Sequence, residues 1–249
     1  GMGDGIAFND SVLTANISTV THLYVDNKYI SDLTGIEDFT NLFYLNCSEN
    51  LLSLLDVSNN IALDFLICSD NQITSLDVSQ NIALDHLYIG VNPISSIDLS
   101  QNIALTYFDM SYNLITTLDL SQNISLYGII CNNSQVTSID LSANTSLTEF
   151  MFLGNISLTS IDLRNGNNTN VIFTHFSGNP NLICVDVDDP VYSAANWDSA
   201  PYSFNCATAL GCNNLTACNY NPLATIDDGS CILSNCVTNI TQNTFSTTI

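Results

Sequence analysis

The sequence predicts a mainly β solenoid, in which short coils stack on one another and share a parallel sheet, with little or no regular helix. An internal repeat is the main observation behind this prediction. The tetrad Asn60-Ile61-Ala62-Leu63 recurs unchanged at residues 81–84 and 102–105, each time after 21 residues. A single repeat cannot bury its own apolar face, so neighbouring copies must cover it.

The first half of each repeat predicts a short strand followed by a turn. In the copy that starts at Leu63, the side chains of Leu66 and Cys68 are two residues apart, and this spacing points both of them inward from one strand. Asn71 then turns the chain, with its amide bonded to backbone groups. The same position is filled down the chain by Asn50, Asn71, Asn92, Asn113, Asn155 and Asn179, with Ser134 as the one exception.

The second half of the repeat has the same spacing as the first. Leu52, Leu55, Val57 and Asn60 repeat the pattern, so both long sides of the coil are expected to be extended and the solenoid to be flat and poor in helix. A second asparagine ladder is predicted at Asn60, Asn81, Asn102, Asn123 and Asn144.

The repeats also predict the domain boundaries. Residues 1–19 would cover the open N-terminal end of the core, and residues 20–183 would form the solenoid. We expect a C-terminal cap at 184–206, a small cysteine-rich module at 207–236 and a Thr- and Asn-rich tail at 237–249.

Charge and motifs exclude several classes of function. The chain has 24 acidic residues and only two basic ones, Lys28 and Arg164, which gives a formal net charge of −22. Such a surface repels phosphate backbones, so we expect no nucleic-acid partner. The sequence contains no run of 18 apolar residues, so it predicts no membrane span. Catalytic motifs are missing too, and two basic residues cannot hold an anionic transition state, so we predict that the chain is not an enzyme.

The pattern Leu-x-x-Leu-x-Cys-x-x-Asn, followed by Leu-Asp-Val-Ser-x-Asn, resembles the 21-residue leucine-rich repeats of bacterial surface proteins. These include internalins with a cysteine ladder and secreted proteins of the Bacteroidetes. The resemblance covers about residues 20–206 and implies the leucine-rich-repeat fold (right-handed β-α superhelix class) with a concave recognition face. It also implies a secreted or cell-surface location.

A second resemblance lies in the tail. The segment from Gly211 to Cys231, with Ala-Cys-Asn-Tyr-Asn-Pro and Asp-Asp-Gly-Ser-Cys inside it, is similar to a cysteine module of secreted marine Bacteroidetes proteins. The four tail cysteines allow three pairings. The resemblance implies that Cys212 pairs with Cys231, which leaves Cys218 for Cys236.

The remaining cysteines fall into two groups. Cys47, Cys68 and Cys131 occupy an inward position that other repeats fill with Ile, Met or Phe, so they are expected to be packing residues. Cys184 and Cys206 flank a segment that looks like the C-terminal cap of the related bacterial repeats. A bridge between them would close the end of the core, and disulfides place the protein outside the cytoplasm.

Aromatic residues gather at the exposed strand positions and predict a binding face. Exposed aromatic and apolar patches mark interaction sites, and Tyr and His beside acidic residues suit a glycan or a protein. Cross-strand packing is the alternative explanation. The candidate ligand-binding residues are Tyr24, Tyr44, Phe65, Ile67, His86, Tyr88, Tyr107, Asp109 and Tyr112.

Calcium is the one cofactor that the sequence raises. Asn219, Asn221, Asp227 and Asp228 supply oxygen ligands ahead of Gly229, although an Asp-Asp-Gly turn explains the same residues. A column of aspartates either bonds turn amides or binds cations. Its members are Asp56, Asp77, Asp98, Asp119, Asp140, Asp162 and Asp186.

The sequence therefore predicts a monomeric, non-enzymatic extracellular recognition or adhesion protein that binds a protein or glycan on its concave face. Two alternatives remain open. One is a structural or calcium-dependent adhesive surface protein, and the other is a non-catalytic targeting partner of a secreted hydrolase system.

Overall fold

The computed structural model describes residues 17–198, 200–203, 205–206, 210–221, 224, 226–227 and 229–233. The chain divides into two compact units, Gly1–Phe204 and Asn205–Ile249. The first unit holds the stacked coils and is described first.

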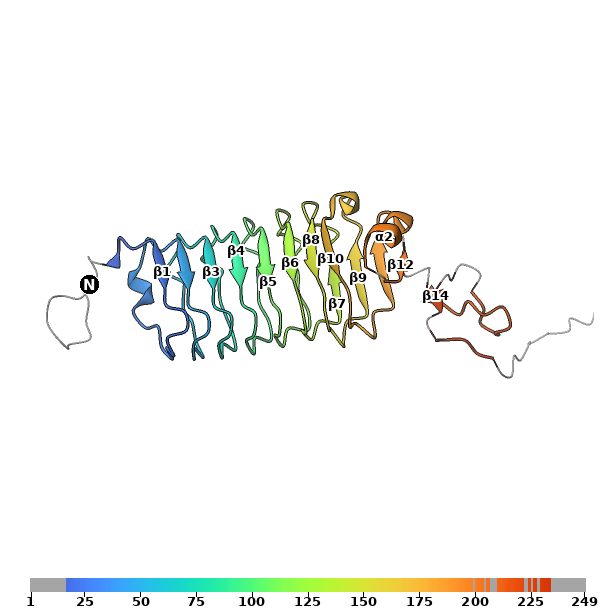
Figure 1. Ribbon diagram of the computed structural model, residues 1–249, viewed down its shortest axis with the longest axis horizontal. Coiled ribbons are helices and arrows are strands. Elements are labelled where there is room, and N and C mark those ends of the chain that lie inside the picture. The colour runs from blue at the N-terminus through green and yellow to red at the C-terminus, as the bar shows by residue number, and fades with distance from the viewer. Residues whose placement is uncertain are drawn as a thin grey trace, which may run out of the picture. The chain divides into compact units, whose positions relative to one another are not determined.

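An eight-stranded parallel sheet runs along one side of the first unit (Figure 1). Each residue of a strand pairs with the equivalent residue of the next coil, as His86 pairs with Tyr107, so the predicted register of the 21-residue repeat is confirmed. The central residue of the strand is buried in most coils, and its two neighbours face outward. The strands are β1 (His22–Tyr24), β2 (Tyr44–Asn46), β3 (Phe65–Ile67), β4 (His86–Tyr88), β5 (Tyr107–Asp109), β6 (Gly128–Ile130), β8 (Glu149–Met151) and β10 (Phe173–His175).

A second parallel sheet covers the other long side of the last coils. Its order is β12-β11-β9-β7. The strands are β7 (Ser138–Asp140), β9 (Ser160–Leu163), β11 (Cys184–Val187) and β12 (Tyr202–Ser203). The described residues hold little helix, namely α2 (Pro190–Asn196) and two short 3-10 turns, η1 (Ile36–Asp38) and η2 (Asn168–Asn170). The predicted mainly β solenoid is therefore confirmed. None of the helices in this part of the chain has the length and apolar character needed to cross a bilayer.

Two asparagine ladders tie the coils together. The Asn113 side chain accepts a hydrogen bond from the Ile94 amide at 3.1 Å and donates to the carbonyl oxygens of Ile89 and Met110. In the second ladder, Asn102 Nδ2 donates to the carbonyls of Val78 and Asn81. The bonds recur in neighbouring coils, and they satisfy backbone groups that would otherwise be buried without partners.

Aspartates of the predicted column stabilise turns by accepting backbone amides. Asp56 Oδ1 accepts the Ser58 amide at 2.9 Å, and the same bond recurs at Asp77, Asp98, Asp119 and Asp140. Hydrogen bonds from the side chain and amide of Ser58 lower the pKa of Asp56. The turn interpretation of these aspartates thus has a direct geometric basis.

The turns that follow the strands of the eight-stranded sheet contain a residue with a left-handed backbone, and in several coils this residue is not glycine. Glu49, Asp70, Val91 and Tyr112 all have φ between 53° and 57°, and Gly154 takes over the position further along the chain. Val91 is the strained member, because a β-branched residue in this region is a genuine outlier.

Replacing Val91 with asparagine is therefore expected to raise the free energy of unfolding by about 1 kcal/mol, since asparagine tolerates this conformation. Urea unfolding followed by circular dichroism would measure it. Asn133 occupies the equivalent turn with φ 49°, so Asn133→Val should lose a similar amount. If Val91→Asn instead lowers the free energy of unfolding, packing of the Val91 side chain outweighs the backbone strain.

The end of the first unit is closed by α2 and the segment after it. The Asp189 side chain caps α2 by accepting the amides of Val191 and Tyr192. Trp197 follows the helix and packs edge-on against the core ring of Phe150, with their centroids 5.6 Å apart. Cys184 and Cys206 are both disulfide-bonded.

The second unit is small and contains a pair of two-residue parallel strands, β13 (Leu210–Gly211) and β14 (Ile226–Asp227). Cys212 and Cys231 form a disulfide, which is the pairing that the resemblance implies. Cys218 is also disulfide-bonded. Its predicted partner, Cys236, lies outside the described residues, so that pairing stays a prediction.

Candidate functional site

The predicted aromatic residues form one continuous stack on the outer surface of the eight-stranded sheet. Centroid separations along the column are 5.8 Å from His22 to Tyr44, 5.0 Å to Phe65, 4.6 Å to His86 and 6.0 Å to Tyr107. The interplanar angles in this column are 22° or less. We call the following residues the aromatic stack: His22, Tyr24, Tyr44, Phe65, His86, Tyr88, Tyr107 and Tyr127.

Stacking decides which parts of these rings a ligand can reach. Tyr88 lies 5.5 Å from Phe65 and 5.4 Å from Tyr107, so each ring in the middle of the stack has neighbours on its faces. Both Tyr88 and Tyr107 are half-buried, and burial raises the pKa of each hydroxyl, so the rings are only partly open to solvent. A sugar that stacks on an aromatic needs a free ring face. The middle of the stack therefore suits partners that contact ring edges and hydroxyl groups.

Gly128 ends the regular column. A Cβ built at Gly128 would collide with the ring atoms Cδ2 and Cε2 of Tyr107, so this ring lies directly over the glycine backbone. Beyond it, the next members of the column are Glu149 and Phe173. A small cavity of about 90 Å³ lies next to Gly128 in the chain, and we call it the Gly128 cavity. Its lining residues are Tyr107, Ile129, Ile130, Glu149, Phe150, Met151 and Phe173.

Carboxylates border the aromatic stack. Asp85 Oδ2 lies 2.8 Å from His86 Nδ1, and Asp109 Oδ1 accepts the Ser111 amide at 2.9 Å. Burial, followed by repulsion from Asp85, raises the pKa of Asp64. Burial also raises the pKa of Tyr107 to about 12, with Tyr88 as the next largest cause, so the hydroxyl stays protonated at neutral pH.

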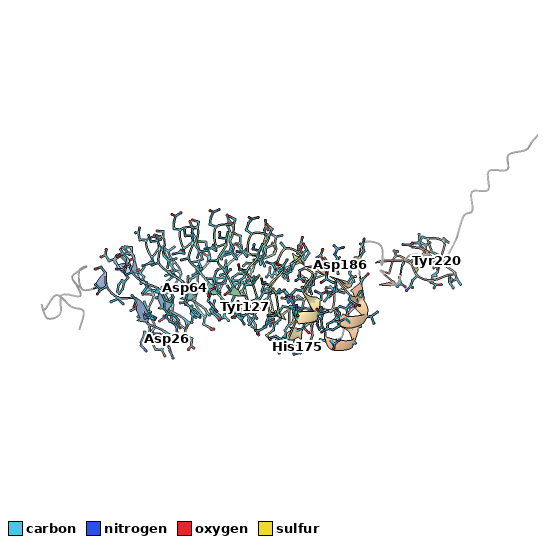
Figure 2. The ribbon with its side chains drawn as sticks, turned by 90° about the horizontal axis from the view of Figure 1, so that it is seen from above. Asp26, Asp64, Tyr127, His175, Asp186 and Tyr220 are labelled. Carbon is cyan, nitrogen blue, oxygen red and sulfur yellow. A yellow bond between two sulfur atoms is a disulfide. The ribbon has the colours of Figure 1, made fainter. Side chains whose placement is uncertain are left out.

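Sequence reasoning found most of this surface and missed part of it. Ile67 and Asp109 lie on the sheet as predicted, whereas Tyr112 lies in the turn after β5 and is 57% exposed. The missed residues are Phe43, Asp64, Asp85 and Tyr127, one residue before the strand in their coils. Figure 2 places Asp64 and Tyr127 along the body of the solenoid. Their 21-residue spacing was the available signal.

The three histidines are spread over separate strands and do not converge. His175 Nδ1 pairs with Asp198 Oδ2, which ties the last concave strand to the segment after α2. Within the part of the chain that the structure describes, no three His, Cys, Asp or Glu side chains are grouped so that they could hold a metal ion. The inward Cys47, Cys68 and Cys131 are free and buried, and burial raises the pKa of Cys47 and Cys131 to about 12.

Two of the four candidate calcium ligands of the tail accept hydrogen bonds from backbone amides of the same unit. Asn219 Oδ1 accepts the Ile232 amide at 2.8 Å, and Asp227 Oδ1 accepts the Gly229 amide at 3.0 Å. Asn221 lies in the same unit, and Asp228 lies outside the described residues. Calcium binding by the tail stays a prediction.

Comparison with known proteins gives a fold and no closer relationship. No family profile matches the chain, and no curated protein matches it. Among solved structures, internalin C2 of Listeria monocytogenes is 18% identical with a TM-score of 0.62, over 77% of this chain and 84% of that one. Internalin F of the same organism is 21% identical with a TM-score of 0.50, over 72% of this chain and 65% of that one.

A third solved structure is the functional domain of internalin J of L. monocytogenes, which includes a cysteine ladder. It is 24% identical with a TM-score of 0.41, over 71% of this chain, and the chain spans only 61% of that domain. At these identities the likeness concerns architecture alone. The solenoid of this chain has the leucine-rich-repeat fold that the internalins share.

Proposed function

We propose that the chain is a non-enzymatic extracellular recognition protein that binds a protein partner through the aromatic stack on its concave sheet. The observation that carries the proposal is the stack itself, which joins rings from five successive strands into one continuous surface. Tyrosine is enriched among the few residues that carry most of the binding energy of protein interfaces. The fold supports the proposal in general, because solenoids present extended surfaces to their partners.

A protein partner is favoured over a glycan by the way the rings lie. Ring faces in the middle of the stack are covered by neighbouring rings, while hydroxyls and carboxylates stand at its border. Such a surface offers hydrogen bonds at its edges and apolar contact across the ring edges, which suits a protein surface better than the flat face of a sugar. The disulfide bonds support an extracellular setting.

The test is a screen of purified secreted and surface proteins, with a glycan array beside it, against the whole chain and the double variant Tyr88→Ser/Tyr107→Ser. We expect proteins that bind the wild type to bind the double variant with at least tenfold lower affinity. Five ring contacts involve Tyr88 or Tyr107, and each lost contact costs about 0.2–1 kcal/mol, so the melting temperature should fall by about 2–20 °C while the variant stays folded at 25 °C.

The matched control is Ile82→Ser/Ile103→Ser, which removes two apolar side chains that are 62% and 60% exposed in the turns outside the sheet. This variant should bind as the wild type does. If the partners bind both double variants as well as they bind the wild type, the concave face is not the binding site. Capture of glycans alone, with loss in the tyrosine variant, would reject the protein partner and keep the site.

A further inference from the structure

The concave face carries negative charge with almost no basic residue to neutralise it. Asp64, Asp85, Asp109 and Glu149 border the aromatic stack. Arg164, one of the two basic residues in the chain, pairs with Asp162 on β9, in the other sheet, at 2.5 Å. The face therefore presents carboxylates and ring edges together, and its electrostatic complement is a cationic surface.

The cavity beside Gly128 adds a place for one particular side chain. Its volume of about 90 Å³ is large enough to accept the outer part of a long side chain. Its walls combine apolar side chains with polar surface, and Phe173, one of the lining residues, is 47% exposed. Glu149 supplies the one carboxylate in the lining.

This combination matches the chemistry of a basic side chain. Lysine and arginine bury an apolar stem while they keep the charged end near water or a carboxylate. Aromatic walls add a favourable contact with a cation. A neutral apolar side chain would leave the half-buried carboxylate of Glu149 without a partner, which is unfavourable.

We infer that the concave face binds a protein segment rich in lysine and arginine, with one basic side chain seated in the Gly128 cavity beside Glu149. The inference rests on the proposed function and names the class of partner. The partner's positive charge complements the carboxylates along the stack, and the seated side chain fixes its position. Attraction of this kind raises the rate of association and weakens as salt is added.

The test uses a fluorescent decalysine peptide and its fully acetylated form, which keeps the stems and lacks the charges. Fluorescence anisotropy with the whole chain should show binding of decalysine at low salt and at least tenfold weaker binding of the acetylated peptide. Glu149→Gln should weaken decalysine binding at least fivefold. The control Asp98→Asn removes one charge from the opposite long side, where asparagine can still accept the Ser100 amide, and should change binding less than twofold.

Two results would overturn the inference. Equal weakening in both charge variants would mean that the net charge of the molecule attracts the peptide without a defined site. Absence of decalysine binding at low salt would exclude the basic partner altogether. Neither result bears on the proposed function, because the tyrosine variants test that with partners of any charge.

Discussion

Replacing Asn113 with alanine is expected to lower the free energy of unfolding by about 1–3 kcal/mol. Asn113 is 2% exposed, and its side chain bonds backbone groups on both sides of the coil boundary. Its loss leaves the Ile94 amide buried without its partner, while the Ile89 carbonyl keeps the hydrogen bond from Asn92 Nδ2. Each buried unsatisfied group costs about 1–3 kcal/mol.

The measurement is urea unfolding followed by circular dichroism. Asn113→Ser is the matched control, because Ser134 fills the equivalent position one coil later and its hydroxyl still donates to the Met110 carbonyl at 3.1 Å. The serine variant should lose clearly less than the alanine variant. A loss below about 1 kcal/mol in Asn113→Ala would mean that water replaces the ladder at little cost.

The second large effect is expected in the small unit. Replacing both Cys212 and Cys231 with serine should unfold this unit while the solenoid stays folded. The bridge spans 19 residues of sequence, and a loop of about this length is worth about 3 kcal/mol. A unit this small has too little buried apolar surface to replace that contribution.

Limited proteolysis of the whole chain, read by mass spectrometry, would follow the two units separately. We expect rapid cleavage between residues 210 and 233 in the variant and protection of residues 17–203 in both proteins. The wild type treated with a reductant serves as the control and should behave like the variant. Continued protection of the small unit in the variant would show that its backbone and side-chain contacts suffice.

Much of the fold could be predicted because the repeat is regular. A 21-residue step determines which residues of successive coils lie side by side, and it predicts the strand pairs from Tyr44 to Glu149 in register. The first and last pairs follow steps of 22 and 24 residues, from His22 to Tyr44 and from Glu149 to Phe173. The two asparagine ladders followed from the same step. The left-handed turns at Glu49, Asp70 and Val91 could not be predicted, because the residues there are not the glycine or asparagine that usually mark this conformation.

The candidate site was predictable in position and less so in shape. Alternation along each strand placed the aromatic residues on one face. It could not show that the rings turn their faces toward each other, because that depends on side-chain torsions and neighbouring bulk. The Gly128 cavity depends on where the Tyr107 and Phe173 rings lie, because both rings line it, and strand alternation does not specify those positions.

The equivalence of the middle coils has a consequence for how such a chain can change over generations. Asn81 and Asn102 make the same bonds to the coil before them, in each case to a carbonyl 21 residues earlier. Duplication or deletion of 63 base pairs in frame would add or remove one whole coil, and every junction would still meet a matching surface. The recognition surface can thus lengthen or shorten by one strand in a single genetic event, with the two ends of the solenoid left as they are.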